Sequence, residues 1–138
     1  MDYFIGLFLA VAVCGAAKLA GFDRERVFYP TMLMVIATYY VLFAAMGGGA
    51  RALLPESLVA AAFLAAAVAG FRSTLWIVVV ALAGHGIFDV VHPRLVENDG
   101  VPAWWPPFCL VFDLVAAVFL AAMLARRPGF ALGRGAGK

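Results

Sequence analysis

The chain has 138 residues, of which 66% are apolar and 13% are charged, with a formal net charge of +2. Soluble globular domains carry roughly 25% charged residues, so this chain is too apolar for a surface that faces water. Its charges fall in short clusters between long apolar runs, which indicates one membrane domain in contact with the lipid bilayer. A net charge this small, without a basic stripe interleaved with aromatic residues, gives no sign of a nucleic-acid partner.

A membrane-spanning helix needs about 20 predominantly apolar residues, and five stretches approach this length. They lie near residues 3–20, 27–46, 57–71, 74–91 and 107–125. We therefore predict an all-α, polytopic membrane helix bundle with about five transmembrane helices. The first stretch has an acidic residue, Asp2, where a signal peptide has a basic start, so we interpret it as a retained span.

The third span is the shortest of the five. Pro55, Glu56 and Ser57 at its start are typical of the first turn of a helix, and the run Gly47, Gly48 and Gly49 ends the span before it. A version with four spans, in which the third segment lies at the membrane surface, is the alternative.

Lysine and arginine collect on the cytoplasmic side of membrane proteins. If the N-terminus lies outside, eight basic residues fall inside, namely Lys18, Arg24, Arg26, Arg72, Arg126, Arg127, Arg134 and Lys138. Only Arg51 and Arg94 then fall outside. We predict an outside N-terminus and a cytoplasmic C-terminus, with a five-span bundle over residues 1–125. Residues 126–138 form a basic, glycine-rich cytoplasmic tail whose composition argues against ordered structure.

Alanine recurs at every fourth position in the first and fifth spans. The positions are Ala12, Ala16 and Ala20, and then Ala117, Ala121 and Ala125. Small residues at this spacing let helices approach closely in lipid. We expect these faces to pack against other helices, within the chain or between copies in a homo-oligomer.

The fourth span carries the most unusual polar residues of the chain. Its sequence GHGIFDVVHP places His85, Asp89 and His92 at positions i, i+4 and i+7, within a narrow arc of one helix face. Ionisable groups in a span are costly and normally face the bundle interior or a water-filled cavity. These residues are therefore candidates for a functional site.

The fifth span supplies a second polar face, with Cys109 and Asp113 one turn apart. Asp113 lies about seven residues inside the start of this span, and His85 lies as far inside the end of the fourth, so both should be roughly 10 Å below the outer boundary. We predict that the two spans are antiparallel neighbours. Asp89 and Cys109 should then share a shallower level.

Aromatic residues surround the same depth. The second span brings Tyr39 and Tyr40 to this level, and adjacent helical positions diverge by about 100°, so we expect only one of them to face inward. Trp104 and Trp105, at the start of the fifth span, are interpreted as interfacial anchors.

Three interpretations of the polar residues remain open. Imidazole and carboxylate suit zinc or iron, and the easiest ligand set is Asp89 with His85 or His92, completed by Asp113 or Cys109. A hydrogen-bonded relay from His85 through Asp89 to His92 would instead move protons between the outer surface and the middle of the membrane. In the third interpretation these side chains only hydrogen-bond the helices together.

The strings GHGIFDVVHP and GVPAWWPPFC, and the FDL that contains Asp113, resemble the signature of a small bacterial integral membrane protein family of unknown function. The resemblance covers most of the chain and is specific from Gly84 to Asp113. It implies a multi-pass protein of the bacterial inner membrane and brings no activity with it. The seven-span hydrolases that hold zinc with three histidines and an aspartate differ, because both histidines of this chain lie on one helix.

Three functions suit these observations. The preferred one is a membrane enzyme, metal-assisted or acid–base, that acts on a lipid or other apolar substrate through His85, Asp89, His92 and Asp113. The others are a proton- or ion-coupled permease and a non-catalytic subunit or scaffold. A permease needs a path across the whole membrane, and nothing comparably polar continues the cluster inward. The sequence does not name the substrate.

Overall fold

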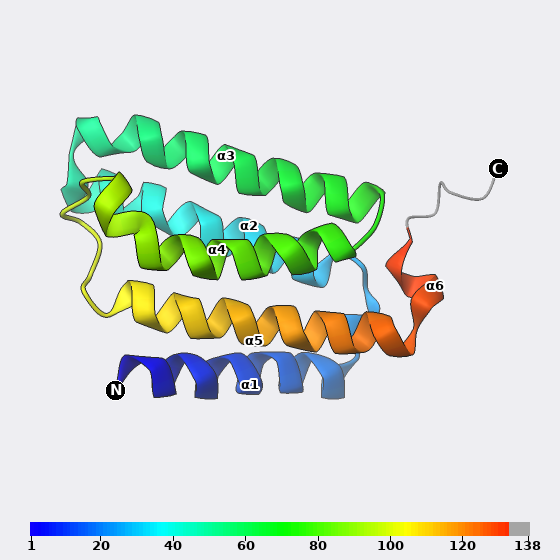
Figure 1. Cartoon of the computed structure of the whole chain (residues 1–138). Coiled ribbons are helices and arrows are strands. Elements are labelled where there is room, and N and C mark those ends of the chain that lie inside the picture. The colour runs from blue at the N-terminus through cyan, green and yellow to red at the C-terminus, as the bar shows by residue number, and fades with distance from the viewer. Residues whose placement is uncertain (133–138) are drawn as a thin grey trace.

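The computed structural model describes residues 1–132 and is a bundle of long helices (Figure 1). Five are long and apolar enough to cross a membrane, as predicted. They are α1 (Asp2–Ala20), α2 (Phe28–Phe43) with the π-helical turn η2 (Ala44–Gly48), α3 (Ala50–Arg72), α4 (Trp76–Leu95) and α5 (Trp105–Arg126). The short helices η1 (Phe22–Arg24) and α6 (Pro128–Ala131) complete the described part. The chain is a multi-pass membrane protein.

Successive long helices run in opposite directions, which gives the bundle two ends (Figure 1). The loop end holds Gly49 and the α4–α5 connection, residues 96–104; the basic end holds the α1–α2 and α3–α4 connections and α6. Among the described residues, Lys18, Arg24, Arg26, Arg72, Arg126 and Arg127 lie near the basic end. Arg51 and Arg94 lie near the loop end.

Helix α5 packs against both α1 and α4, while α3 packs against both α2 and α4 (Figure 1). The prediction that the fourth and fifth spans are antiparallel neighbours is confirmed. Gly86 makes this contact close, because a Cβ at this position would lie 3.0 Å from the Leu110 carbonyl oxygen and 3.2 Å from Asp113 Cβ. A side chain here would push α4 away from α5.

The packed face of α1 is not the predicted one. Ala12, Ala16 and Ala20 are exposed, so their predicted packing within the chain is wrong. The buried residues are Gly6, Ala10, Cys14 and Ala17. Gly6 selects this face, since a Cβ on Gly6 would collide with the backbone of Phe108 in α5. A homo-oligomer through the exposed alanines stays a prediction.

In α5 the predicted alanine face is only partly packed. Ala117 is buried, Ala121 is half-buried and Ala125 is exposed. Leu120 and Leu124 take the buried positions instead, because the packed face follows the helical period of about 3.6 residues rather than a strict spacing of four.

Helix α3 begins earlier than predicted. Gly49 has a φ of 74°, and the helix starts directly after it and runs for 23 residues. Pro55 lies inside the helix, so the predicted start at residues 55–57 is wrong. A proline near a helix start removes only one backbone hydrogen bond, which the helix tolerates. The alternative with four spans is not supported, because α3 is long and apolar enough to cross a membrane.

The first part of the tail is ordered, contrary to the prediction from its composition. Arg26 donates hydrogen bonds to the carbonyl oxygens of Phe130 and Phe71, and Leu75 N–H donates to Ala131 O at 2.9 Å. Partial burial lowers the pKa of Arg26 from its ordinary value. These contacts hold α6 against the basic end. Residues 133–138 of the predicted tail lie outside the described residues.

Candidate metal centre

Five carboxylate or imidazole side chains are buried inside the bundle, each with an exposed fraction of 2% or less: Glu56, His85, Asp89, His92 and Asp113. All lie between the middle of the bundle and the loop end. No lysine or arginine is buried among residues 1–132. The buried acidic and imidazole groups of the described chain are therefore confined to one half, with an excess of carboxylates.

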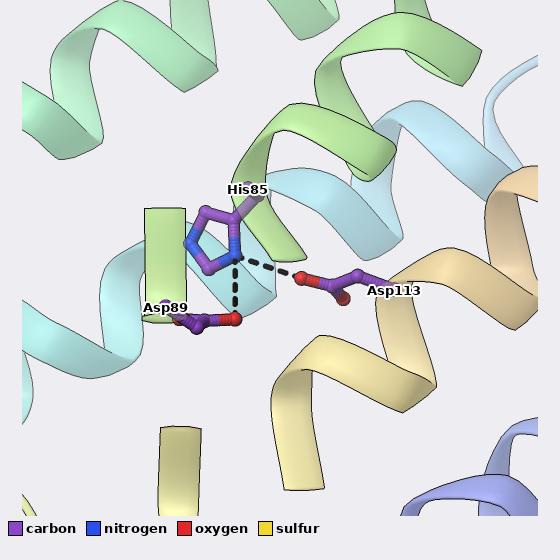
Figure 2. Close-up of side chains that lie close together, drawn as sticks. All are labelled: His85, Asp89 and Asp113. Carbon is purple, nitrogen blue, oxygen red and sulfur yellow. Dashed lines mark hydrogen bonds and ion pairs between the residues drawn. The ribbon is translucent and has the colours of Figure 1, made fainter. Parts of the chain in front are cut away.

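Three of the five converge on one point (Figure 2). His85 Nδ1 lies 2.8 Å from Asp113 Oδ2 and 3.6 Å from Asp89 Oδ2. One ligand atom from each residue can be chosen so that all lie within 4.8 Å of one another. The predicted match in depth between His85 and Asp113 is confirmed by this contact.

The local sequence explains the convergence. His85 and Asp89 are one helical turn apart, so both project from the same face of α4. That face is turned toward α5, where Asp113 meets it at the level that Gly86 leaves open. The centre therefore depends on a close contact between two helices and on one glycine beside it.

Helix α2 supplies a fourth group. The Tyr40 hydroxyl donates a hydrogen bond of 2.5 Å to Asp89 Oδ1, which turns Asp89 Oδ2 toward His85. Tyr40 is buried, whereas Tyr39 is only half-buried and packs against Trp105 with ring centroids 4.7 Å apart. The prediction that one of the two tyrosines faces inward is confirmed.

The second histidine belongs to a different cluster. His92 Nε2 lies 2.8 Å from Glu56 Oε1, and Asn98 donates to the same oxygen at 2.7 Å and to the Tyr40 carbonyl at 3.1 Å. The relay considered from the sequence has no direct hydrogen bond between Asp89 and His92 in this structure, because Asp89 accepts from Tyr40 and His92 pairs with Glu56. The two clusters meet at the Tyr40 ring, which stacks on His92 at 4.0 Å.

Glu56 and Asn98 are the residues that sequence reasoning missed. Glu56 was interpreted as a first-turn acid, but it lies in the second turn of α3 and is fully buried. A signal for it exists in the sequence. A span of about 20 residues that ends at Arg72 must begin near Leu53, and Glu56 then falls inside the membrane.

Three other residues that the sequence singled out, Cys109, Trp104 and Trp105, are not part of the centre. Cys109 is buried but is not one of the three residues whose ligand atoms come together. Trp104 is 49% exposed, consistent with an anchor, whereas Trp105 is only 8% exposed. The interpretation of Trp105 as an interfacial anchor is wrong, because its ring packs between Tyr39 and Phe43.

The charges of the buried groups do not balance. Three carboxylates face two imidazoles, so even two protonated histidines leave a formal charge of −1. Glu56 Oε2, Asp89 Oδ2 and Asp113 Oδ1 are buried without a hydrogen-bond partner. An unpaired buried charge is very costly. The interior must therefore take up an additional proton or a cation.

The three converging side chains fit a metal cation. Donor atoms bonded to zinc at about 2.0–2.2 Å in a tetrahedron are roughly 3.3 Å apart. The distances from His85 Nδ1 to the two aspartates, 2.8 and 3.6 Å, lie on either side of that value. One imidazole and two carboxylates suit zinc or iron. The Tyr40 hydroxyl holds Asp89 in place by a hydrogen bond, as residues around a metal site commonly do for the side chains that bind the metal.

Two surface depressions approach the polar half. At the loop end a pocket of about 590 Å³ is lined by His92, Asn98, Glu97 and Asp99. An apolar groove of about 680 Å³ runs between α1, α2 and α5, with Tyr39, Trp105, Cys109 and Phe112 in its walls. Two residues in its walls, Tyr39 and Phe112, directly precede Tyr40 and Asp113 in the sequence.

Comparisons with known proteins add no functional assignment, since no family model, no curated protein and no solved structure matches the chain. The chemistry of the buried residues is therefore the basis of the functional argument.

Proposed function

We propose that this chain is a membrane-embedded metalloenzyme that holds zinc or iron with His85, Asp89 and Asp113 and acts on a lipid or other apolar molecule. One observation carries the proposal: these three buried side chains have ligand atoms within 4.8 Å of one another, and two of their carboxylate oxygens lack hydrogen-bond partners. A cation would offset the excess negative charge that the interior otherwise has to bear.

Three protein ligands are the number typical of catalytic zinc sites, which keep a further position for water or substrate. A metal at such a site supplies a Lewis acid or an activated water. The apolar groove beside α5 supports an apolar substrate, because it opens along the surface of the bundle and its walls include Cys109 and Phe112, which flank Asp113 on α5. A molecule dissolved in the bilayer would approach the centre along this groove.

A proton- or ion-coupled permease is the second candidate. It is favoured by the buried polar groups that extend inward from the loop end, with Asn98, Glu56 and His92 nearer that end and Tyr40, Asp89 and His85 deeper. Against it, no buried carboxylate, imidazole, lysine or arginine within residues 1–132 lies between Asp113 and the basic end. Val78, Leu82, Leu120 and Leu124 fill the interior there. A transmembrane path should continue through that region.

The proposed location is the bacterial inner membrane, with the basic end in the cytoplasm. Support comes from the gathering of basic residues at that end. Reporter fusions after Arg127 and within residues 94–101 should report opposite sides, with the first inside. Reports from the same side would contradict the five-span topology.

The decisive experiment is metal analysis of the purified protein. We expect about one zinc or iron per chain in the wild type and close to none in His85→Ala and Asp113→Ala, because losing one of three ligands leaves too few to hold the ion. His92→Gln is the matched control and should keep the metal, since His92 pairs with Glu56 outside the centre.

A wild-type protein without stoichiometric metal, even after incubation with zinc and with ferrous iron, would remove the metal proposal. Proton-linked flux through vesicles, abolished by Asp89→Asn, would then support the permease. If a cell lacking the native protein is fully complemented when His85, Asp89, His92 and Asp113 are all replaced by apolar residues, both functions are excluded.

A further inference from the structure

A second pocket, separate from the metal centre, lies at the basic end between α1, η1 and α5. It has a volume of about 400 Å³, and four basic side chains line it: Lys18, Arg24, Arg126 and Arg127. They come from three different parts of the chain, so the fold and not a local run of charge brings them together. Asp23 is the single acidic residue in its wall.

These four cations have no ion-pair partner among the described residues. Every ion pair found within residues 1–132 involves His85 or His92, which lie far from this end. Arg26 differs, because it donates to two carbonyl oxygens and lies 6.0 Å over the Phe130 ring. Arg26 therefore has a structural role, whereas the pocket presents an excess of positive charge, four basic groups against Asp23, that suits an anionic ligand.

The other wall of the pocket is apolar. Val118, Phe119, Ala122 and Met123 of α5 line it, and Val118 is 66% exposed. From Arg126 to Val118 the helix rises about 12 Å, so this wall extends from the charged rim well into the hydrocarbon region. A ligand that uses the whole pocket needs a negatively charged head and an apolar chain.

We propose that this pocket binds an anionic phospholipid of the adjacent leaflet, with its phosphodiester headgroup among the four basic residues and an acyl chain along α5. Basic pockets between transmembrane helices on the cytoplasmic side are suited to such headgroups. A free phosphate ion would meet the charged rim alone and would leave the apolar wall unused. The lipid therefore fits the pocket better than the ion does.

The test measures binding of defined ligands to the purified full-length chain in a neutral detergent, by native mass spectrometry and by the shift in unfolding midpoint. The ligands are dioleoyl phosphatidylglycerol, dioleoyl phosphatidylcholine and inorganic phosphate. We expect the anionic lipid to bind and stabilise the protein, and the zwitterionic lipid and inorganic phosphate to have little effect.

The test variant is Lys18→Gln with Arg24→Gln and Arg126→Gln. Each basic group near an anionic surface contributes about fivefold, so the triple variant should bind phosphatidylglycerol roughly a hundredfold more weakly. The matched control, Arg51→Gln with Arg94→Gln, removes charge from the loop end and should bind as the wild type does. If the triple variant does not fold, the three single variants are compared, and each should lose about fivefold.

Equal binding of the two lipids, or undiminished binding by the triple variant and by each single variant, would overturn the proposal. Binding of inorganic phosphate as strong as that of the lipid would also overturn it, because the apolar wall would then contribute nothing. Metal content is a separate readout and should not change in any of these variants.

Discussion

The two histidines of α4 lie two turns apart on one helix face and have contrasting structural roles. His85 meets two aspartates, one from its own helix and one from α5, whereas His92 meets Glu56 and shares it with Asn98. At the first cluster, two carboxylate oxygens stay without partners. At the second, Glu56 Oε1 accepts from two side chains, and only Glu56 Oε2 has no partner.

The two clusters therefore differ in charge, because the first has two carboxylates for one imidazole and the second has one carboxylate for one imidazole. Charge excess is concentrated where helices α4 and α5 meet. The cluster around His92 lies nearer the loop-end pocket and ties α2, α3, α4 and the α4–α5 connection together. We therefore expect changes at the first cluster to alter chemistry and changes at the second to alter stability.

The largest effect should follow metal removal. An ion present at a thousand times its dissociation constant stabilises the folded state by about 4 kcal/mol, so a chelator should lower the free energy of unfolding of the wild type by this amount. His85→Ala should show no chelator effect, and Glu56→Gln should show the full effect. The measurement is detergent-based unfolding with and without chelator. A chelator effect lost in both variants would erase the distinction between the clusters.

A smaller loss should come from Glu56→Ala. This change leaves His92 and Asn98 without their shared acceptor, and an unsatisfied buried polar group costs about 1–3 kcal/mol. The free energy of unfolding should fall by that amount while metal content stays the same. Glu97→Ala at the exposed loop is the control and should be neutral. Loss of metal in Glu56→Ala would show that the second cluster is part of the centre.

The close approach of α4 to α5 can be tested by replacing each of two glycines of α4, Gly86 and Gly84, with alanine. Gly86→Ala places a Cβ against Leu110 and Asp113, whereas nothing lies within 4 Å of a Cβ at Gly84. Alanine is favoured over glycine in a helix by about 1 kcal/mol, so Gly84→Ala should be neutral or stabilising. Gly86→Ala should lose about 1–2 kcal/mol through overpacking and bind metal more weakly. Equal behaviour of the two variants would contradict the close approach.

The smallest effect on stability is expected for Tyr40→Phe. Hydrogen bonds between helices in membranes average about 0.6 kcal/mol, and the ring that stacks on His92 is retained. Metal affinity should nevertheless fall roughly 10- to 100-fold, because Asp89 loses the group that orients it. Tyr39→Phe is the matched control. Unchanged metal affinity in Tyr40→Phe would mean that Tyr40 only joins helices.

Much of this arrangement follows from the sequence because it depends on regular helices. Apolar length gives the five spans, and the rise per residue places His85 opposite Asp113. The same rules apply to Tyr40 and Tyr39, since neighbouring positions must face different ways. Where helical geometry alone sets the depth and direction of a side chain, both can be predicted by counting residues along the chain.

The incorrect predictions concern residues whose position or orientation is set by a contact with a distant segment of the chain. Glu56 follows a proline and precedes a serine, which is also the usual pattern of a helix start. The left-handed backbone of Gly49 and the length of the span both place the start of α3 earlier. His92 is turned to Glu56 by a contact between residues 36 positions apart. The ordered start of the tail likewise depends on Arg26, 104 positions from Phe130.

The apolar filling of the basic half has an electrical consequence. A cation bound at the proposed centre from the loop end would lie near Asp113, roughly 10 Å into a hydrocarbon core of about 30 Å, and would cross about a third of the membrane field. Since one charge crossing 100 mV changes energy by about 2.3 kcal/mol, a divalent ion here would gain roughly 1.5 kcal/mol per 100 mV, close to tenfold in affinity. With the loop end outside, an energised membrane would strengthen cation binding at the centre and a depolarised one would weaken it.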